Sequence, residues 1–379
     1  MSNRWPGGLI RKTPVTPAGP LQTGAAPGVW TLAEAAYWTK QGLWPIAGNR
    51  LQYIAVGSTN TPFVTAYPWS SSGFGTKFAN PATLPTSAGR NVAFTSVGNA
   101  IAVAHETTPF VTAYPWSNSG FGTKFADPAT LPTNGCRGVA FSPADDAIAV
   151  AHFITPFVSA YPWSGSGFGT KFADPATLPT ATGNGVAFSP AGNAIAVAHD
   201  SSPFVTAYPW SGSGFGTKFT NPATLPTGNG NTVAFSPSGN AIAVAHATSP
   251  FVTAYPWSGS GFGTKFANPA TLPASLGFGV AFSPAGNAIA VAHVASPNIT
   301  AYPWSGSGFG TKFADPATLP TATGIRVAFS YAGDAIAVAQ DGSPGVTAYP
   351  WSGSGFGTKF TNPVTLPAGL GNGVAFSAI

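Results

Sequence analysis

The chain has 379 residues, enough for one large closed repeat domain with an appendage. Only 7% of the residues are charged, while 47 glycines and 38 prolines favour many short strands joined by tight turns. The net charge is +5, and residues 1–50 hold five basic residues against one acid, so the remaining 329 residues carry only +1, which argues against a nucleic-acid binder.

The single cysteine, Cys136, excludes a disulfide within the chain. The first residues lack the apolar stretch of a secretory signal, and no run of about 18 apolar residues occurs. We therefore expect synthesis in a cytoplasm, without a signal peptide and without insertion into a membrane. Such synthesis is compatible with a protein that later leaves the cell by lysis.

Residues 1–45 are predicted to form an extended docking arm rich in glycine and proline. A short helix is expected at 32–41, because Thr31 and Glu34 form a capping box and Gly42 follows. The arm holds every tryptophan outside the repeat described below, and so short a segment must pack these indoles on the rest of the chain or on another chain. The residues expected to dock are Trp5, Arg11, Lys12, Trp30, Trp38 and Trp44.

The segment from Gly24 to Pro45 reads GAAPGVWTLAEAAYWTKQGLWP. It resembles the G-V-W-T-L…G-x-W-P segment that recurs in tail-fibre and other virion structural proteins of tailed bacteriophages. The resemblance implies a virion protein of the tail or a surface appendage, present in multiple copies and anchored to other virion proteins through residues 1–45. It implies no catalytic residue.

The rest of the chain consists of a 47-residue repeat, marked by a tryptophan at that interval. These tryptophans are Trp69, Trp116, Trp163, Trp210, Trp257, Trp304 and Trp351. A period in the forties with several short strand-like runs indicates a propeller blade rather than a helical solenoid. The sequence therefore predicts an all-β fold, a seven-bladed β-propeller over residues 46–379.

Each repeat is expected to give four strands separated by proline and glycine turns. In one copy they are predicted at 186–189, 194–199, 204–208 and 216–219. In the second strand, Ile195 and Val197 share one face and alanines share the other, which we interpret as small residues near the ring axis and larger ones farther out. The stretch VAFSPAGNAIAVA also resembles the V-A-F-S-P-D-G consensus of WD40-type propellers, with Trp-Ser here in place of Trp-Asp.

The ring is expected to close with strands from both ends of the repeat region. Residues 51–379 number 329, which is seven times 47. The first copy begins at its second strand, and the last residues supply only a first strand. The stretch from Gly373 to Ser377 should therefore complete the first blade and remove a free sheet edge.

Seven lysines recur once per repeat on the expected outermost strand. They would suit a cationic belt for anionic glycans or phosphates, but charges on an edge strand are also the usual protection against edge pairing, which we favour. They are Lys77, Lys124, Lys171, Lys218, Lys265, Lys312 and Lys359.

All five histidines occupy one repeat position, which is Ser58 and Gln340 in the other two copies. Equivalent atoms should lie on the order of 10 Å apart, far more than the ~2.1 Å of a Zn–N bond. We therefore expect no metal, and structural imidazoles bonded to a nearby loop or to the tryptophan-bearing strand. They are His105, His152, His199, His246 and His293.

Carboxylates are few and irregular, and Asp127, Asp174 and Asp315 occupy positions that other copies fill with asparagine. No acid recurs beside a base or a nucleophile. We therefore predict no catalytic residue and no cofactor, and do not expect an enzyme.

The copies differ mainly in two turns, just before the first strand and between the second and third strands. In an up-and-down blade both turns lie at the same end, so we expect one varied face and one uniform face. Random sequence change should affect all exposed turns, so variation confined to one face indicates recognition. The alternative is that tight glycine and proline geometry holds the uniform turns constant. The residues predicted to bind a ligand are Arg90, Arg137, Asn184, Asn231, Phe278, Glu106, Phe153 and Asp200.

The sequence thus predicts a phage virion protein whose varied face binds the host surface, with carbohydrate as the expected ligand and copies on the particle adding avidity. Two alternatives stay open. One is a purely structural or decoration protein of the virion with no host ligand. The other is a cellular propeller lectin.

Overall fold

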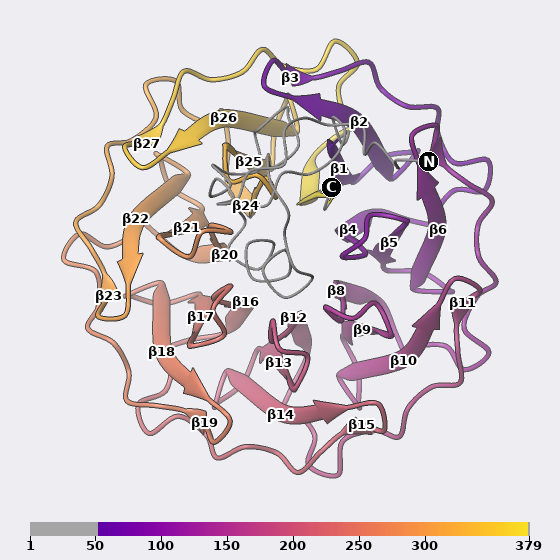
Figure 1. Cartoon of the computed structure of the whole chain (residues 1–379), viewed down its shortest axis with the longest axis horizontal. Helices are drawn as coiled ribbons and strands as arrows, with labels where there is room; N and C mark the ends of the chain where they lie inside the picture. The colour runs from indigo at the N-terminus through magenta and orange to yellow at the C-terminus, as the bar shows by residue number, and fades with distance from the viewer. Residues whose placement is uncertain (1–51, 378–379) are drawn as a thin grey trace, which may run out of the picture. The chain divides into compact units, whose positions relative to one another are not determined.

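The computed structural model describes residues 52–377. The predicted arm, its helix at 32–41 and its docking residues lie outside the described residues. The chain divides into two units, Met1–Leu51 and Gln52–Ile379. The second unit holds 28 strands in seven four-stranded antiparallel sheets arranged as a ring, which confirms the seven-bladed β-propeller (Figure 1). Over the described residues, no helix is long and apolar enough to cross a membrane.

Blade 1 has the order β28-β1-β2-β3, and blades 2 to 7 follow in chain order from β4, β8, β12, β16, β20 and β24. The inner strands are β28 (Gly371–Phe376), β4 (Gly89–Phe94), β8 (Cys136–Phe141), β12 (Gly183–Phe188), β16 (Gly230–Phe235), β20 (Gly277–Phe282) and β24 (Gly324–Phe329). The second strands are β1 (Gln52–Ser58), β5 (Ala100–His105), β9 (Ala147–His152), β13 (Ala194–His199), β17 (Ala241–His246), β21 (Ala288–His293) and β25 (Ala335–Gln340). The third strands are β2 (Val64–Ser70), β6 (Val111–Ser117), β10 (Val158–Ser164), β14 (Val205–Ser211), β18 (Val252–Ser258), β22 (Ile299–Ser305) and β26 (Val346–Ser352). The outer strands are β3 (Gly73–Phe74), β7 (Gly120–Phe121), β11 (Gly167–Phe168), β15 (Gly214–Phe215), β19 (Gly261–Phe262), β23 (Gly308–Phe309) and β27 (Gly355–Phe356).

The outer strand is shorter than predicted and lies earlier in the repeat. In blade 4 it is β15, of two residues, rather than 216–219, and Lys218 follows it outside any strand. The ladder to β14 pairs Trp210 with Phe215 and then reaches Pro209, which accepts a hydrogen bond from Gly216 at 2.8 Å. Because proline has no N–H to donate, the ladder ends there.

The core lies between neighbouring blades. The alanine face of β13 packs on Val244, Tyr255 and Trp257 of blade 5. On its other face, Ile195 and Val197 pack on the alanine face of β9 in blade 3. The small and the large residues of the second strand therefore lie on opposite faces of a blade. The prediction that side-chain size increases from the ring axis to the rim is wrong. The physical reason is that successive side chains of a strand point to opposite faces of its sheet.

The recurring tryptophan explains the conserved aromatic residues of the repeat. Trp210 meets Phe172, Phe188 and Phe215 edge to face, with ring centroids 5.1–5.3 Å apart. The hydroxyl of Tyr208 donates to the Thr177 carbonyl oxygen, 2.7 Å away. The near-identical residues of the seven copies thus build the ring.

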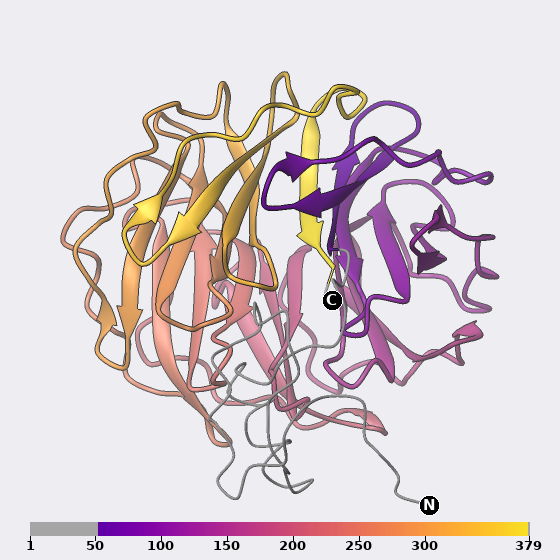
Figure 2. The ribbon, with the colours of Figure 1, turned by 45° about the horizontal axis from the view of Figure 1, so that its top comes forward.

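The closure of the ring is confirmed. Strand β28 pairs antiparallel with β1, and Ile54 lies opposite Phe376 (Figure 2). The ladder extends one residue further, because the Ser377 N–H donates to the Tyr53 carbonyl oxygen at 2.9 Å. The last strand of the described chain therefore completes the blade that the first strand begins.

Candidate axial binding pocket

A β-bulge interrupts the inner strand of every blade. In blade 4, Gly183 lies opposite His199 and Gly185 lies opposite Ala198, so that Asn184 is the extra, unpaired residue. The corresponding residues of the other blades are Arg90, Arg137, Asn231, Phe278, Ile325 and Asn372. A bulge turns its extra side chain away from the regular alternation. The bulged residues are those at which the copies differ, and they belong to the inner strand rather than to the turn before it.

The glycine before the bulge lets neighbouring blades approach closely. A Cβ atom on Gly183 would lie 2.3 Å from the Phe157 carbonyl oxygen in the preceding blade. A residue without a side chain is therefore favoured at this point. The same tight packing holds the bulged residue close to the turns of the adjacent blade.

The two varied turns lie at the same end of the ring, as predicted. Within one blade they are joined by backbone hydrogen bonds, such as the one from the Asp200 N–H to the Thr182 carbonyl oxygen at 3.2 Å. Side chains also join them, since Arg90 on β4 forms a salt bridge of 2.7 Å with Glu106 after β5.

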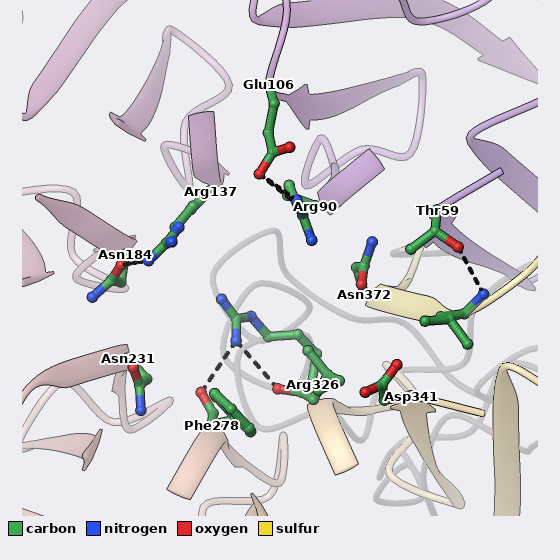
Figure 3. Close-up of a pocket in the computed structure, with 12 residues that line it drawn as sticks. Thr59, Arg90, Glu106, Arg137, Asn184, Asn231, Phe278, Arg326, Asp341 and Asn372 are labelled. Atoms are coloured by element: carbon green, nitrogen blue, oxygen red, sulfur yellow. Dashed lines mark hydrogen bonds and ion pairs between the residues drawn. The ribbon is translucent and has the colours of Figure 1, made fainter. Parts of the chain in front are cut away.

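These residues surround a pocket at the mouth of the central channel, with a volume of about 350 Å³ (Figure 3). All seven bulged residues contribute to its lining. The remaining lining residues are Thr59, Glu106, Arg326, Asp341 and Leu370.

Six of the eight residues predicted to bind a ligand line this pocket, and two lie behind it. Phe153 is covered by the guanidinium of Arg137, which lies 4.3 Å from the centre of its ring. Asp200 accepts a hydrogen bond of 2.6 Å from the Asn184 amide. Both residues therefore support the lining.

The bulged asparagines also connect neighbouring blades. The amide of each donates to the carbonyl oxygen of the glycine that opens the next inner strand, at 2.8–3.1 Å. The three pairs are Asn184 with Gly230, Asn231 with Gly277, and Asn372 with Gly89. At least one side-chain N–H group of each asparagine is thus engaged between blades, and the Asn184 amide donates to Asp200 as well. The role of Asn184 and Asn231 in ligand binding stays a prediction.

Arg137 connects the lining differently. One of its N–H groups donates to the Asn184 side-chain oxygen at 2.6 Å. Burial lowers the pKa of its guanidinium and the positive charge of Arg90 adds to this, while Asp200 and Glu106 oppose the shift.

Arg326 is a pocket residue that the sequence analysis missed. It directly follows the bulge in β24, and its side chain extends across the channel between the blades (Figure 3). The equivalent residues of the other blades are Asn91, Gly138, Gly185, Thr232, Gly279 and Gly373. The sequence does show that this position has a long cationic side chain in one copy and small residues in the others. It does not show that the position faces the channel.

The histidines have the structural role predicted for them. Nε2 of His105 lies 2.8 Å from the Thr112 hydroxyl on the tryptophan-bearing strand, and its Nδ1 lies 3.3 Å from the Thr86 hydroxyl in a loop. Burial lowers the pKa of each of the five histidines to about 4. Among the described residues, no cluster of His, Cys, Asp or Glu could hold a metal ion.

The seven lysines lie near the rim, each beside the acid or amide three residues later. Lys124, Lys171 and Lys312 form salt bridges with Asp127, Asp174 and Asp315, and the others contact asparagine. They therefore belong to local pairs rather than to a row of strand charges.

No protein family model matches the chain, and no curated protein resembles it in sequence. Solved structures do share its fold. A protein of Bacteroides uniformis provisionally named 6-phosphogluconolactonase is 14% identical, with a TM-score of 0.66, and the match covers 86% of this chain and 99% of the other. A periplasmic gluconolactonase of Pseudomonas aeruginosa is 16% identical over the same shares of both chains, with a TM-score of 0.65. A protein of Lactobacillus plantarum is 13% identical over the same shares, with a TM-score of 0.68. These likenesses show a common fold.

The neighbours overturn the expectation that the chain is not an enzyme, because two of them are named as lactonases and have the same fold over nearly their whole length. That expectation rested on the lack of an acid–base pair that recurs in every repeat. A single axial pocket takes one group from each of several blades, so its chemistry does not need to recur.

Proposed function

We propose that this chain is a structural protein of a tailed-bacteriophage virion, in the tail or a surface appendage, and that its axial pocket binds a carbohydrate of the host surface. The resemblance of residues 24–45 to virion proteins supports the first part, with residues 1–45 as the anchor to other virion proteins. Many copies on one particle would turn weak binding by each ring into firm attachment.

One observation carries the binding role: the near-identical copies differ at the bulged inner-strand residue, and the bulged residues of all seven blades line a common pocket. Asparagine at this position bonds to the next blade. A ring that served only as a spacer would gain stability from asparagine in every copy. Phe278 and Ile325 forgo that bond. An aromatic ring beside amides and guanidiniums is a surface on which a sugar can stack and form hydrogen bonds.

Hydrolysis of a sugar lactone in the same pocket is a second candidate function, favoured by the names of the structural neighbours. The carboxylate of Asp341 lines the pocket and makes no salt bridge to another described residue. It is therefore the group placed to act as a general base on a water molecule.

The test of sugar binding replaces three bulged residues with asparagine, the residue that three other blades already have at this position. We expect the triple variant Arg90→Asn, Arg137→Asn and Phe278→Asn to fold, because asparagine at this position bonds to the next blade in three other blades. Purified full-length protein is applied to a glycan array and, with a fluorescent label, to host cells. The wild type should bind both and the triple variant neither, while their unfolding temperatures stay within a few degrees.

Equal binding by the triple variant would reject the pocket as the binding site, and absence of wild-type binding would favour the purely structural virion protein. The same two proteins are assayed with glucono-δ-lactone. Wild-type hydrolysis above the spontaneous rate, abolished by Asp341→Asn, would instead establish the lactonase.

A further inference from the structure

The side chain of Arg326 extends into the channel, and no acid among residues 52–377 pairs with it (Figure 3). One terminal N–H group donates to the carbonyl oxygens of Phe278 and Ile325, both at 3.2 Å. Its Nε is buried and has no hydrogen-bond partner among the described residues. Within residues 52–377 the guanidinium forms no salt bridge. A guanidinium can donate five hydrogen bonds, so the described residues use only part of this capacity.

The charges around Arg326 make its position costly without a ligand. Desolvation, with a smaller contribution from the positive charge of Arg137, lowers the pKa of its guanidinium to about 10. Among the described residues, the pocket has two acids: Glu106 is already paired with Arg90, and Asp341 forms no salt bridge with Arg326. Arg326 is partly buried, and a partly desolvated cation near a second cation is stabilised when an anion enters between them.

We propose that the axial pocket is an oxyanion site, in which Arg326 and Arg137 bind a carboxylate or phosphate group carried by a saccharide. Guanidinium groups bind such planar or tetrahedral oxyanions through paired N–H donors. The pocket has room for a monosaccharide beside the anionic group, and Phe278 lies next to Arg326 on the same wall. This inference rests on the proposed function, since it names the class of carbohydrate that the pocket takes.

The test compares sugars that differ only in the anionic group. Full-length protein is titrated calorimetrically, at one ionic strength, with methyl β-D-glucuronide, glucose 6-phosphate and the neutral methyl β-D-glucoside. We expect both anionic sugars to bind at least about tenfold more tightly than the glucoside, because hydrogen bonds to charged groups are among the strongest in proteins. The variant Arg326→Thr should lose that preference.

The choice of threonine at position 326 guards against misfolding, and a second variant, Lys218→Gln, controls for net charge. Arg326→Thr introduces the residue that blade 5 already has at this position, where the Thr232 hydroxyl donates to the Phe278 carbonyl oxygen at 2.6 Å. Lys218→Gln removes the same charge near the rim, where the lysine contacts Asn221, and should bind like the wild type.

Thermal unfolding gives a second measurement. Without an anion, Arg326→Thr should unfold at or above the temperature of the wild type, because it removes a partly buried cation that has no ion pair within residues 52–377. Inorganic phosphate should raise the unfolding temperature of the wild type relative to chloride and leave that of the variant unchanged. A large loss of stability in the ligand-free variant would show that Arg326 serves the fold, and would overturn the proposal.

The outcomes separate this inference from the proposed function. Equal affinity for the glucoside and the anionic sugars, an unchanged preference in Arg326→Thr, or no binding of the anionic sugars at millimolar concentration would overturn the oxyanion site. Anionic sugars that bind through Arg326, combined with normal attachment of the variant to host cells, would uphold the oxyanion site and reject the role in host binding.

Discussion

At the scale of single residues, three of the buried histidines, His105, His152 and His199, act as neutral bridges between a loop and a strand. The imidazole of His199 connects the hydroxyls of Thr180 and Thr206. In blade 7, Gln340 forms the equivalent pair of bonds, at 2.6 Å and 2.9 Å, with an amide that does not titrate. The structure thus contains its own comparison between a titrating and a non-titrating residue at one position.

We predict that the stability of the ring falls as the pH falls from about 6.5 to about 4, because the histidines have lowered pKa values in the folded state and the unfolded chain takes up protons first. His199→Gln should keep the wild-type free energy of unfolding at pH 7. Between pH 7 and about pH 5 it should lose about 1–2 kcal/mol less than the wild type. Urea unfolding at both pH values measures this, and an equal loss in both proteins would contradict the predicted titration.

At the scale of the strand, no two neighbouring blades both have a residue larger than glycine at the position after the bulge. Around the ring, each larger residue follows a glycine of the preceding blade: Asn91 follows Gly373, Thr232 follows Gly185, and Arg326 follows Gly279. The inner strands converge at this level, so two neighbouring side chains do not fit. This packing rule limits where a long side chain such as that of Arg326 can enter the channel.

We predict that Gly279→Ala destabilises the ring by about 1–3 kcal/mol through overpacking. Its Cβ would lie 2.9 Å from the Arg326 Cα and 3.0 Å from the Ile325 carbonyl oxygen, and backbone atoms cannot move aside as a flexible side chain can. Gly212→Ala is the matched control, because its Cβ would meet no atom within 4 Å. Denaturant unfolding of both variants is the measurement, and equal stability would show that the channel can widen.

At the scale of the whole propeller unit, stability depends on one joint between distant parts of the chain. Blade 1 forms only when β28 pairs with β1, and the backbone N–H of Tyr53 also bonds to the Ser377 hydroxyl at 3.0 Å. Without β28, β1 and the inner strands β4 and β24 would lose a packing partner. An unpaired edge also invites association with other chains.

We predict that a chain ending at Gly371 loses its cooperative unfolding transition or aggregates. A chain ending at Ser377 keeps the whole of β28 and should behave like the full-length protein. Thermal unfolding followed by circular dichroism, with size-exclusion chromatography, distinguishes the two. If the shorter chain melts as a monomer at the full-length temperature, the joint is not needed for stability.

The sequence by itself determined the ring, because the 47-residue period, the count of strands and the incomplete first and last copies leave few other ways to bury the repeat. It also identified the differing residues and the face they share, because turn positions follow from strand order. The extent of the outer strand was harder to predict from the sequence. Pro209 lacks the N–H that would continue the ladder, but this matters only once its partner strand is known.

Only the tertiary structure decided how the differing residues act together. The bulge places Asn184 and its equivalents around one pocket, and a bulge depends on pairing with the neighbouring strand, which no local pattern specifies. The significance of Arg326 arises in the same way. The environment of its charge is unusual, because the residues that the other six blades contribute around it include few acids. That environment exists only after residues hundreds of positions apart are brought together.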